Sequence, residues 1–204
     1  MTTPTVLGEQ LRLRTKELHL QLEQTAVARH LMSTTLTVAA YVDILQVWGT
    51  AWNELETALW TTHFALQVPN LLPARRSAKA NIDLRYLAAQ HAIVASRRVE
   101  KNDRAVAPPL TLASFVGVCY VLRGASLGGK VIARHLALTL GLTASHGAAF
   151  FAAGEEGGTW REWLQHADAL IQNQHDIDQA VNSATTTFTF LRQQFSYAAE
   201  PLQT

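Results

Sequence analysis

Residues 120–136, YVLRGASLGGKVIARHL, place three glycines inside what the hydrophobic pattern predicts to be one long helix. Each glycine in a helix interior costs about 0.5–1 kcal/mol relative to alanine, and no turn-forming residues surround these three. Gly124, Gly128 and Gly129 therefore need a physical reason. A missing Cβ permits either close packing against a second helix or close approach of the backbone to a flat ligand. The stretch alone favours packing, and both interpretations stay open.

The rest of the chain shows the same helical periodicity, with no sustained strand alternation, internal repeat or linker. The pattern predicts helices over about residues 8–30, 37–64, 74–90, 111–141, 160–173 and 176–197. Thr111 is a candidate N-cap and Gly141 a candidate C-cap of the long helix. The expected buried positions of the second and third helices are Tyr41, Ile44, Leu45, Trp48, Trp52, Leu55 and Leu59, and Ile82, Leu84 and Leu87. We expect an all-α fold in a single domain over residues 1–204.

Composition excludes several classes of protein. The chain is 48% hydrophobic and 16% charged with a net charge of +1, so nothing favours a nucleic-acid or membrane partner. Its single cysteine, Cys119, excludes an internal disulfide, and its apolar neighbours predict a small buried side chain. The first ten residues are unlike a signal peptide, and no apolar run approaches the roughly 18 residues of a membrane span. We expect a soluble, cytoplasmic protein.

Basic residues gather at two places, which are Arg75, Arg76 and Lys79, and then Arg97, Arg98 and Lys101. Such clusters are usually solvated helix faces. A docking surface for an acidic protein has the same pattern, and the spacing does not separate the two.

Thr15, His19 and Glu23 follow one another at intervals of four, beside an apolar stripe of the first predicted helix. Neutral imidazole is a good iron ligand, and one axial histidine suffices to hold haem iron. Glu23, one turn further on, is placed to orient the ring. Alternatively His19 is a half-buried histidine bonded to a backbone carbonyl, which taken alone is the better interpretation. No other histidine belongs to a zinc or di-iron motif.

Five segments together resemble the haem oxygenase family, and most closely its bacterial, bacteriophytochrome-associated, biliverdin-producing type. They are, in chain order, residues 11–25 (LRLRTKELHLQLEQT), 74–87 (ARRSAKANIDLRYL), 120–132 (YVLRGASLGGKVI), 150–164 (FFAAGEEGGTWREWL) and 184–195 (ATTTFTFLRQQF). Each segment is weak evidence alone. Their order and their spread over nearly the whole chain make the resemblance strong, and it implies a helical bundle with haem between a proximal and a glycine-rich distal helix.

The resemblance implies roles for three residues on the proximal side and at the haem edge. His19 falls at the position of the proximal iron ligand. Arg12, seven residues earlier, falls where the family places a basic contact to a haem propionate. Tyr120 matches a tyrosine of bacterial members that also reaches a propionate.

The resemblance also implies which residues form the distal wall of the haem site. Gly124, Gly128 and Gly129 match glycines whose backbone lies against the haem face, with the backbone of Gly124 and Gly128 closest to the chemistry. Phe188 and Phe195, seven residues apart, match aromatic wall positions. Their spacing alone fits ordinary core packing equally well.

Two positions depart from the family pattern. Ala125 stands where mammalian-type members have an aspartate that orders water, so the source of protons is open. Arg123 stands where bacterial members often have an acidic residue.

The implied activity is opening of haem to biliverdin with release of Fe²⁺ and CO, using O2 and electrons from a ferredoxin or reductase. Haem would be both substrate and cofactor. The implied partners are an acidic electron donor at the basic clusters and a bacteriophytochrome as biliverdin acceptor. Two alternatives remain: a haem carrier without catalysis, and a relative of thiamine-degrading enzymes of the same fold. The latter requires a reactive cysteine, for which the apolar surroundings of Cys119 are unsuited.

Overall fold

A computed structural model of the chain describes residues 6–93, 106–153 and 158–197, and these residues form helices and no strand. The helices are α1 (Val6–Glu23), α2 (Ala26–Leu31), α3 (Val38–Trp60), α4 (Phe64–Gln67), α5 (Ser77–His91), α6 (Leu112–Leu140), α7 (Ala149–Ala152), α8 (Trp160–Leu170) and α9 (Gln174–Tyr197), with a 3₁₀ turn η1 at Pro69–Leu71. The expected all-α fold is confirmed.

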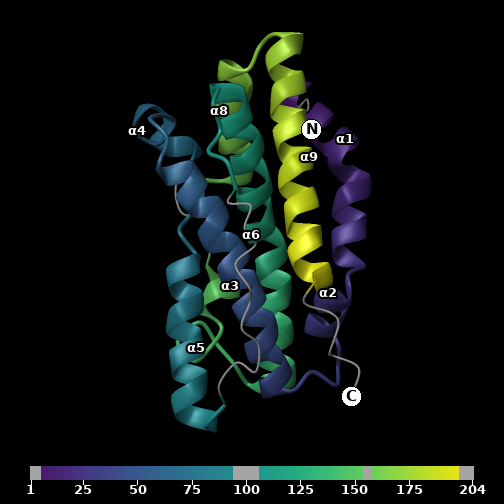
Figure 1. Cartoon of the computed structure of the whole chain (residues 1–204), viewed down its shortest axis with the longest axis vertical. Coiled ribbons are helices and arrows are strands. Elements are labelled where there is room, and N and C mark those ends of the chain that lie inside the picture. Colours follow the sequence, from purple (N-terminus) through teal and green to yellow (C-terminus); the bar gives the residue numbers. More distant parts are fainter. Residues whose placement is uncertain (1–5, 94–105, 154–157, 198–204) are drawn as a thin grey trace.

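Helix α6 runs through the middle of the bundle, with α1 and α9 on one side and α3 and α5 on the other (Figure 1). Thr111 caps its first turn in a capping box with Ser114, and Gly141 ends it at φ +69°, so both predicted caps are confirmed. Among the described residues, α6 is the one helix that is long and apolar enough to cross a membrane. However, 61% of its most apolar window is buried inside the fold, as in the core helix of a soluble protein.

The first helix is shorter than predicted. It ends at Glu23, and Thr25 starts α2 by accepting a hydrogen bond from the Ala28 N–H (3.3 Å) while donating one to the Leu22 carbonyl (2.8 Å). A threonine that bonds the backbone on both sides offers the chain a turn in place of a continued helix. Because of this break α2 runs in a different direction from α1, and residues of both helices line the cavity described below.

The core is built mainly on α3, where all seven predicted positions are buried. The prediction for α5 is partly wrong: Leu87 is buried, but Ile82 is 52% exposed and its neighbour Asp83 is 1% exposed. The Asp83 carboxylate accepts hydrogen bonds from the N–H groups of Ala149 (2.9 Å) and Phe150 (2.8 Å). These bonds satisfy free donors at the start of α7, and they outweigh the apolar pattern that placed Ile82 inside.

Arg76 was expected on a solvated helix face or a docking surface, and neither holds for it because its side chain is 1% exposed. Its Nε donates to the Phe150 carbonyl (2.9 Å), and its guanidinium lies 4.6 Å from the centre of the Phe150 ring. Burial lowers the pKa of Arg76 to about 10, against an opposing effect of Glu56, which accepts the Arg76 backbone N–H. Arg75 is exposed as expected, and the second basic cluster lies outside the described residues.

Candidate functional site

A cavity of about 580 Å³ opens between α1, α2, α3, α6, α8 and α9. It is lined by His19, Leu22, Glu23, Ala28, Leu31, Met32, Trp48, Trp52, Tyr120, Val121, Gly124, Ala125, Leu127, Gly128, Val131, Ile132, Trp160, Phe188, Leu191 and Phe195. Among these described residues, Glu23 alone carries a full charge at neutral pH when histidine is neutral. The volume and apolar lining are those of a small-molecule site of about 300–1,000 Å³.

His19 reaches the cavity from α1 and remains accessible, with 56% of its side chain exposed. Its Nδ1 lies 3.6 Å from Oε1 of Glu23, and its ring meets that of Phe188 edge-on at 5.7 Å between centres. A carboxylate beside Nδ1 favours the tautomer with the proton on that nitrogen, which leaves the Nε2 lone pair for a ligand. The arrangement predicted from the i, i+4 spacing is present.

A bare metal ion has no adequate site among the described residues, because no three His, Cys, Asp or Glu side chains come together there. A single accessible imidazole suits an iron whose other ligands come from a macrocycle. The donor set therefore fits haem better than it fits a free ion.

The three glycines of residues 120–136 in α6 have different surroundings. Around Gly128 a Cβ would meet no other atom within 4 Å, so its backbone faces open cavity. A Cβ on Gly124 would lie 3.6 Å from the Trp160 ring, an ordinary contact. On Gly129 it would lie 2.7 Å from the Phe151 carbonyl and 3.2 Å from Nη2 of Arg76, and Gly129 is not part of the cavity lining. Close packing explains Gly129, which we leave out of the site, and the open space at Gly128 leaves room for a ligand.

Tyr120 and Arg12 are the two residues that the resemblance assigns to the haem propionates. Tyr120 lines the cavity, whereas Arg12 is exposed and outside the lining. Burial raises the pKa of Tyr120, and a hydrogen bond with Thr15 and the positive charge of Arg12 oppose that rise. A phenol that lines the cavity and a guanidinium whose charge acts on it are groups that can bind a carboxylate.

Phe188 and Phe195 are buried and also line the cavity, so the core and wall interpretations both hold. Phe195 packs on Trp48 with 4.7 Å between ring centres, and Trp48 stacks on Trp52 at 5.1 Å. The sequence marked these two tryptophans as core residues only. Trp160 was not singled out, because its helical position alone carries no sign of a ligand.

The two departures from the family pattern lie on different sides of α6. Ala125 lines the cavity and offers it no polar side chain. Arg123 is 3% exposed and points to the loops behind α6, where Nη1 donates to the Leu72 carbonyl (3.1 Å) and Nη2 to that of Gly158 (2.8 Å). Arg123 therefore ties loops to the helix and does not reach the cavity lining.

Comparisons with known proteins identify the family and the fold. The family model described as "Heme oxygenase" matches residues 5–197. A heme oxygenase of Neisseria meningitidis, solved with NO and CO bound, has a TM-score of 0.68 at 19% identity, over 94% of this chain and 91% of that one. A heme oxygenase of Leptospira interrogans has a TM-score of 0.66 at 18% identity, over 94% and 98% of the two chains.

A third solved structure, a heme oxygenase of Synechocystis in complex with heme and NO, has a TM-score of 0.69 at 17% identity, over 94% of this chain and 84% of that one. Similarity at these identities concerns the fold. No curated protein matches the chain at a significant level.

Proposed function

Since the chain belongs to the haem oxygenase family, we propose that it binds haem in this cavity and cleaves it to biliverdin, with release of Fe²⁺ and CO. The reaction uses O2 and electrons supplied from outside. One observation carries the proposal: His19 from α1 and the open backbone at Gly128 from α6 line the same cavity.

The residues present fit a haem. The lining is apolar apart from a few groups, as a flat tetrapyrrole requires, and His19 is the single histidine of the lining. At Gly128 the space that a side chain would fill is open, which lets a flat ring approach the helix backbone. Arg12, whose positive charge acts on Tyr120, and the Tyr120 hydroxyl are the groups that would bind the propionates.

Haem, when bound, supplies both the iron at which O2 is activated and the ring that is opened. His19 would hold the iron through Nε2, and Glu23 would keep the proton on Nδ1. The edge of the His19 ring against Phe188 limits rotation of the imidazole. Arg12 and Tyr120 would bind propionates and set the depth of the ring in the cavity.

Proton delivery at the distal side cannot use a carboxylate at Ala125. Leu127 and Val131 line the cavity and are 40% and 62% exposed, so the cavity opens to solvent beside Gly128. We propose that water entering there, held by backbone groups of the distal helix, supplies the protons.

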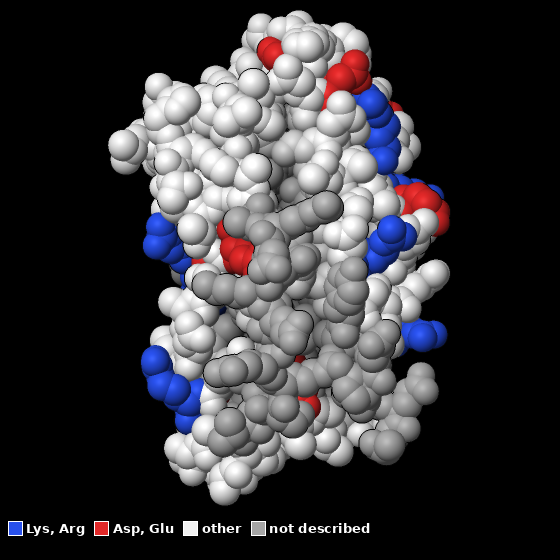
Figure 2. All heavy atoms as spheres, viewed as in Figure 1, with Lys and Arg blue, Asp and Glu red and all other residues white. Residues whose placement is uncertain are grey.

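The electron donor proposed for this enzyme is an acidic ferredoxin or reductase that docks on Lys and Arg side chains. On the face drawn in Figure 2, the Lys and Arg side chains of the described residues lie along its two edges, some of them beside Asp and Glu. We further propose a cytoplasmic location and a bacteriophytochrome as acceptor of the biliverdin.

A haem carrier is the second candidate, and the observation that favours it is the apolar side chain of Ala125 in the cavity. The thiamine-degrading class is not supported. Cys119 is fully buried, and that burial raises the pKa of its thiol far above the usual value, so it is unsuited to nucleophilic attack.

Hemin titration followed by reductant in air tests the proposal. The native protein should lose its Soret band and form biliverdin, whereas His19→Ala should bind hemin more weakly and form none. His166→Ala is a matched control, because His166 is exposed on α8 and outside the cavity lining. A Soret band that persists in the native protein would identify a carrier, and normal biliverdin formation by His19→Ala would refute the ligand assignment.

A further inference from the structure

Trp160 occupies one end of the cavity, against the distal helix. Its indole lines the cavity, and its Cη2 and Cζ3 lie 3.6 Å and 4.0 Å from the position that a Cβ on Gly124 would take. Its ring also lies 5.5 Å, centre to centre, from that of Tyr120. Both glycines line the cavity, but Gly124 has the Trp160 ring beside it, whereas Gly128, one turn later, has no atom within 4 Å of the position of a Cβ.

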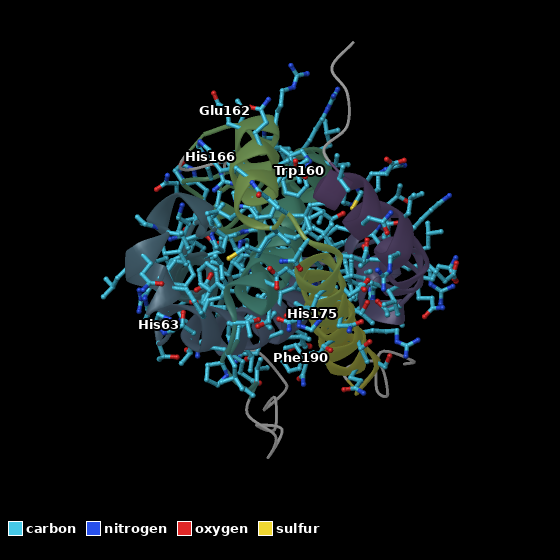
Figure 3. All side chains as sticks on the ribbon, turned by 90° about the horizontal axis from the view of Figure 1, so that it is seen from above. His63, Trp160, Glu162, His166, His175 and Phe190 are labelled. Atoms are coloured by element: carbon cyan, nitrogen blue, oxygen red, sulfur yellow. The ribbon has the colours of Figure 1, made fainter. Side chains whose placement is uncertain are left out.

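Trp160 is held in place from behind. Its ring stacks on Trp163 with 5.2 Å between centres and an interplanar angle of 13°, and Trp163 is 1% exposed with its Nε1 donating to the Leu71 carbonyl (2.9 Å). In Figure 3, Trp160 lies on the side of α8 that faces the bundle, whereas Glu162 of the same helix points outward.

The start of α8 is fixed as well. Thr159, directly before Trp160, and Glu162, two residues after it, form a capping box. Arg123, next to Gly124 on α6, donates to the carbonyl of Gly158. The arginine that departs from the family pattern therefore ties the residue before this cap to the distal helix, and Trp160 has little freedom to withdraw.

We propose that Trp160 is a specificity-determining residue, which sets the in-plane position of the tetrapyrrole and so the meso carbon that is oxidised. A flat ligand meets the indole edge at Gly124 before it can reach the helix backbone there, whereas at Gly128 nothing stands in its way. The meso edge beside Gly128 is then the one exposed to O2. This inference rests on the proposed function. It adds steric contact with the Trp160 ring to the propionate contacts as a second constraint on the in-plane position of the tetrapyrrole.

The test compares Trp160→Ala and Trp160→Leu with the native protein and with Trp60→Ala. Trp60 is a matched control because it is a partly exposed tryptophan outside the cavity lining, 4.7 Å from the Arg75 guanidinium. Two readouts are taken: the ratio of biliverdin isomers by chromatography, and the hyperfine-shifted methyl resonances of the ferric cyanide hemin complex by proton NMR. The NMR pattern reports how the ring is seated without any turnover.

Both Trp160 variants should change the isomer ratio by at least about tenfold, which is the discrimination that one apolar group in a pocket supplies. Their methyl resonances should shift to a second pattern, and Trp60→Ala should match the native protein in both readouts. If Trp160→Ala does not fold, Trp160→Leu decides by the same criteria. Native isomer ratio and native methyl pattern in a folded Trp160 variant would overturn the inference while leaving the proposed function intact. Absence of biliverdin from the native protein would instead refute the proposed function.

Discussion

Adjacent glycines of the distal helix should respond in opposite ways to the same substitution. Alanine at Gly128 adds a methyl group to open space, so the haem-free protein gains the helix propensity of alanine, about 0.5–1 kcal/mol. For a chain of this size that gain raises the melting temperature by about 2–4 °C per kcal/mol.

Alanine at Gly129 places its methyl group 2.7 Å from the Phe151 carbonyl oxygen. That oxygen belongs to the backbone of α7 and cannot rotate away, so α6 and α7 must move apart. Overpacking of this kind costs about 1–3 kcal/mol, which exceeds the gain in propensity and leaves a net loss of about 1 kcal/mol. Gly117→Ala is a more severe reference, because its methyl group would lie 2.2 Å from the Ala180 carbonyl.

The assay is urea unfolding of the haem-free variants, followed by circular dichroism. Haem must be absent, because a ligand that binds the folded state raises stability by mass action. The order of unfolding free energies should be Gly128→Ala, native, Gly129→Ala and Gly117→Ala, with equal urea dependence. A Gly129→Ala variant as stable as Gly128→Ala would refute the assignment of one glycine to ligand access and the other to packing.

Four further predictions concern single side chains. Gly128→Leu should abolish hemin binding in a titration without lowering the stability of the haem-free protein, since its side chain enters open cavity. Tyr120→Phe should raise the hemin dissociation constant about tenfold by removing a hydrogen bond to a charged group. Asp83→Asn should lower the unfolding free energy by about 1–3 kcal/mol, because an amide accepts only one of the two α7 N–H bonds. Hydrogen bonds from Thr159 hold the pKa of Glu162 below its usual value. The stability that these bonds add is therefore present at pH values above the pKa of Glu162 in the unfolded chain, and it is lost as the pH falls through the lower pKa of the folded state. Glu162→Gln should remove this contribution to the fall of the melting temperature in acid.

The features that the sequence predicted correctly depend on neighbours along the chain. The caps of α6 at Thr111 and Gly141 need only local residue types, and the buried face of α3 needs only helical periodicity. His19 beside Glu23 is also a local pair, and the family resemblance supplied its proposed role. These parts of the fold and of the candidate site could therefore be predicted.

The features that the sequence did not reveal depend on contacts between distant segments. Gly128 and Gly129 are adjacent and chemically identical, and only the position of α7 separates their roles. Arg76 and Asp83 resemble surface charges until the carbonyl and N–H groups around Phe150 are placed beside them.

Trp160 shows the same dependence at the site itself. It becomes a cavity residue because α8 is tied back to α6 through Arg123, across 35 positions of sequence. No sequence periodicity links Arg123 to Trp160, so the sequence pattern could not predict that Arg123 fixes the position of α8.

The most direct test of the central claim is the amount of CO and biliverdin released per hemin in a single turnover, in air and with an added reductant. CO is captured by a globin, and biliverdin is identified by mass spectrometry. A haem-degrading enzyme built around His19 and the open backbone at Gly128 should release about one CO and one biliverdin for each hemin consumed, and Gly128→Leu should release neither. Hemin that stays intact in the native protein, or that is bleached without CO, would contradict the account.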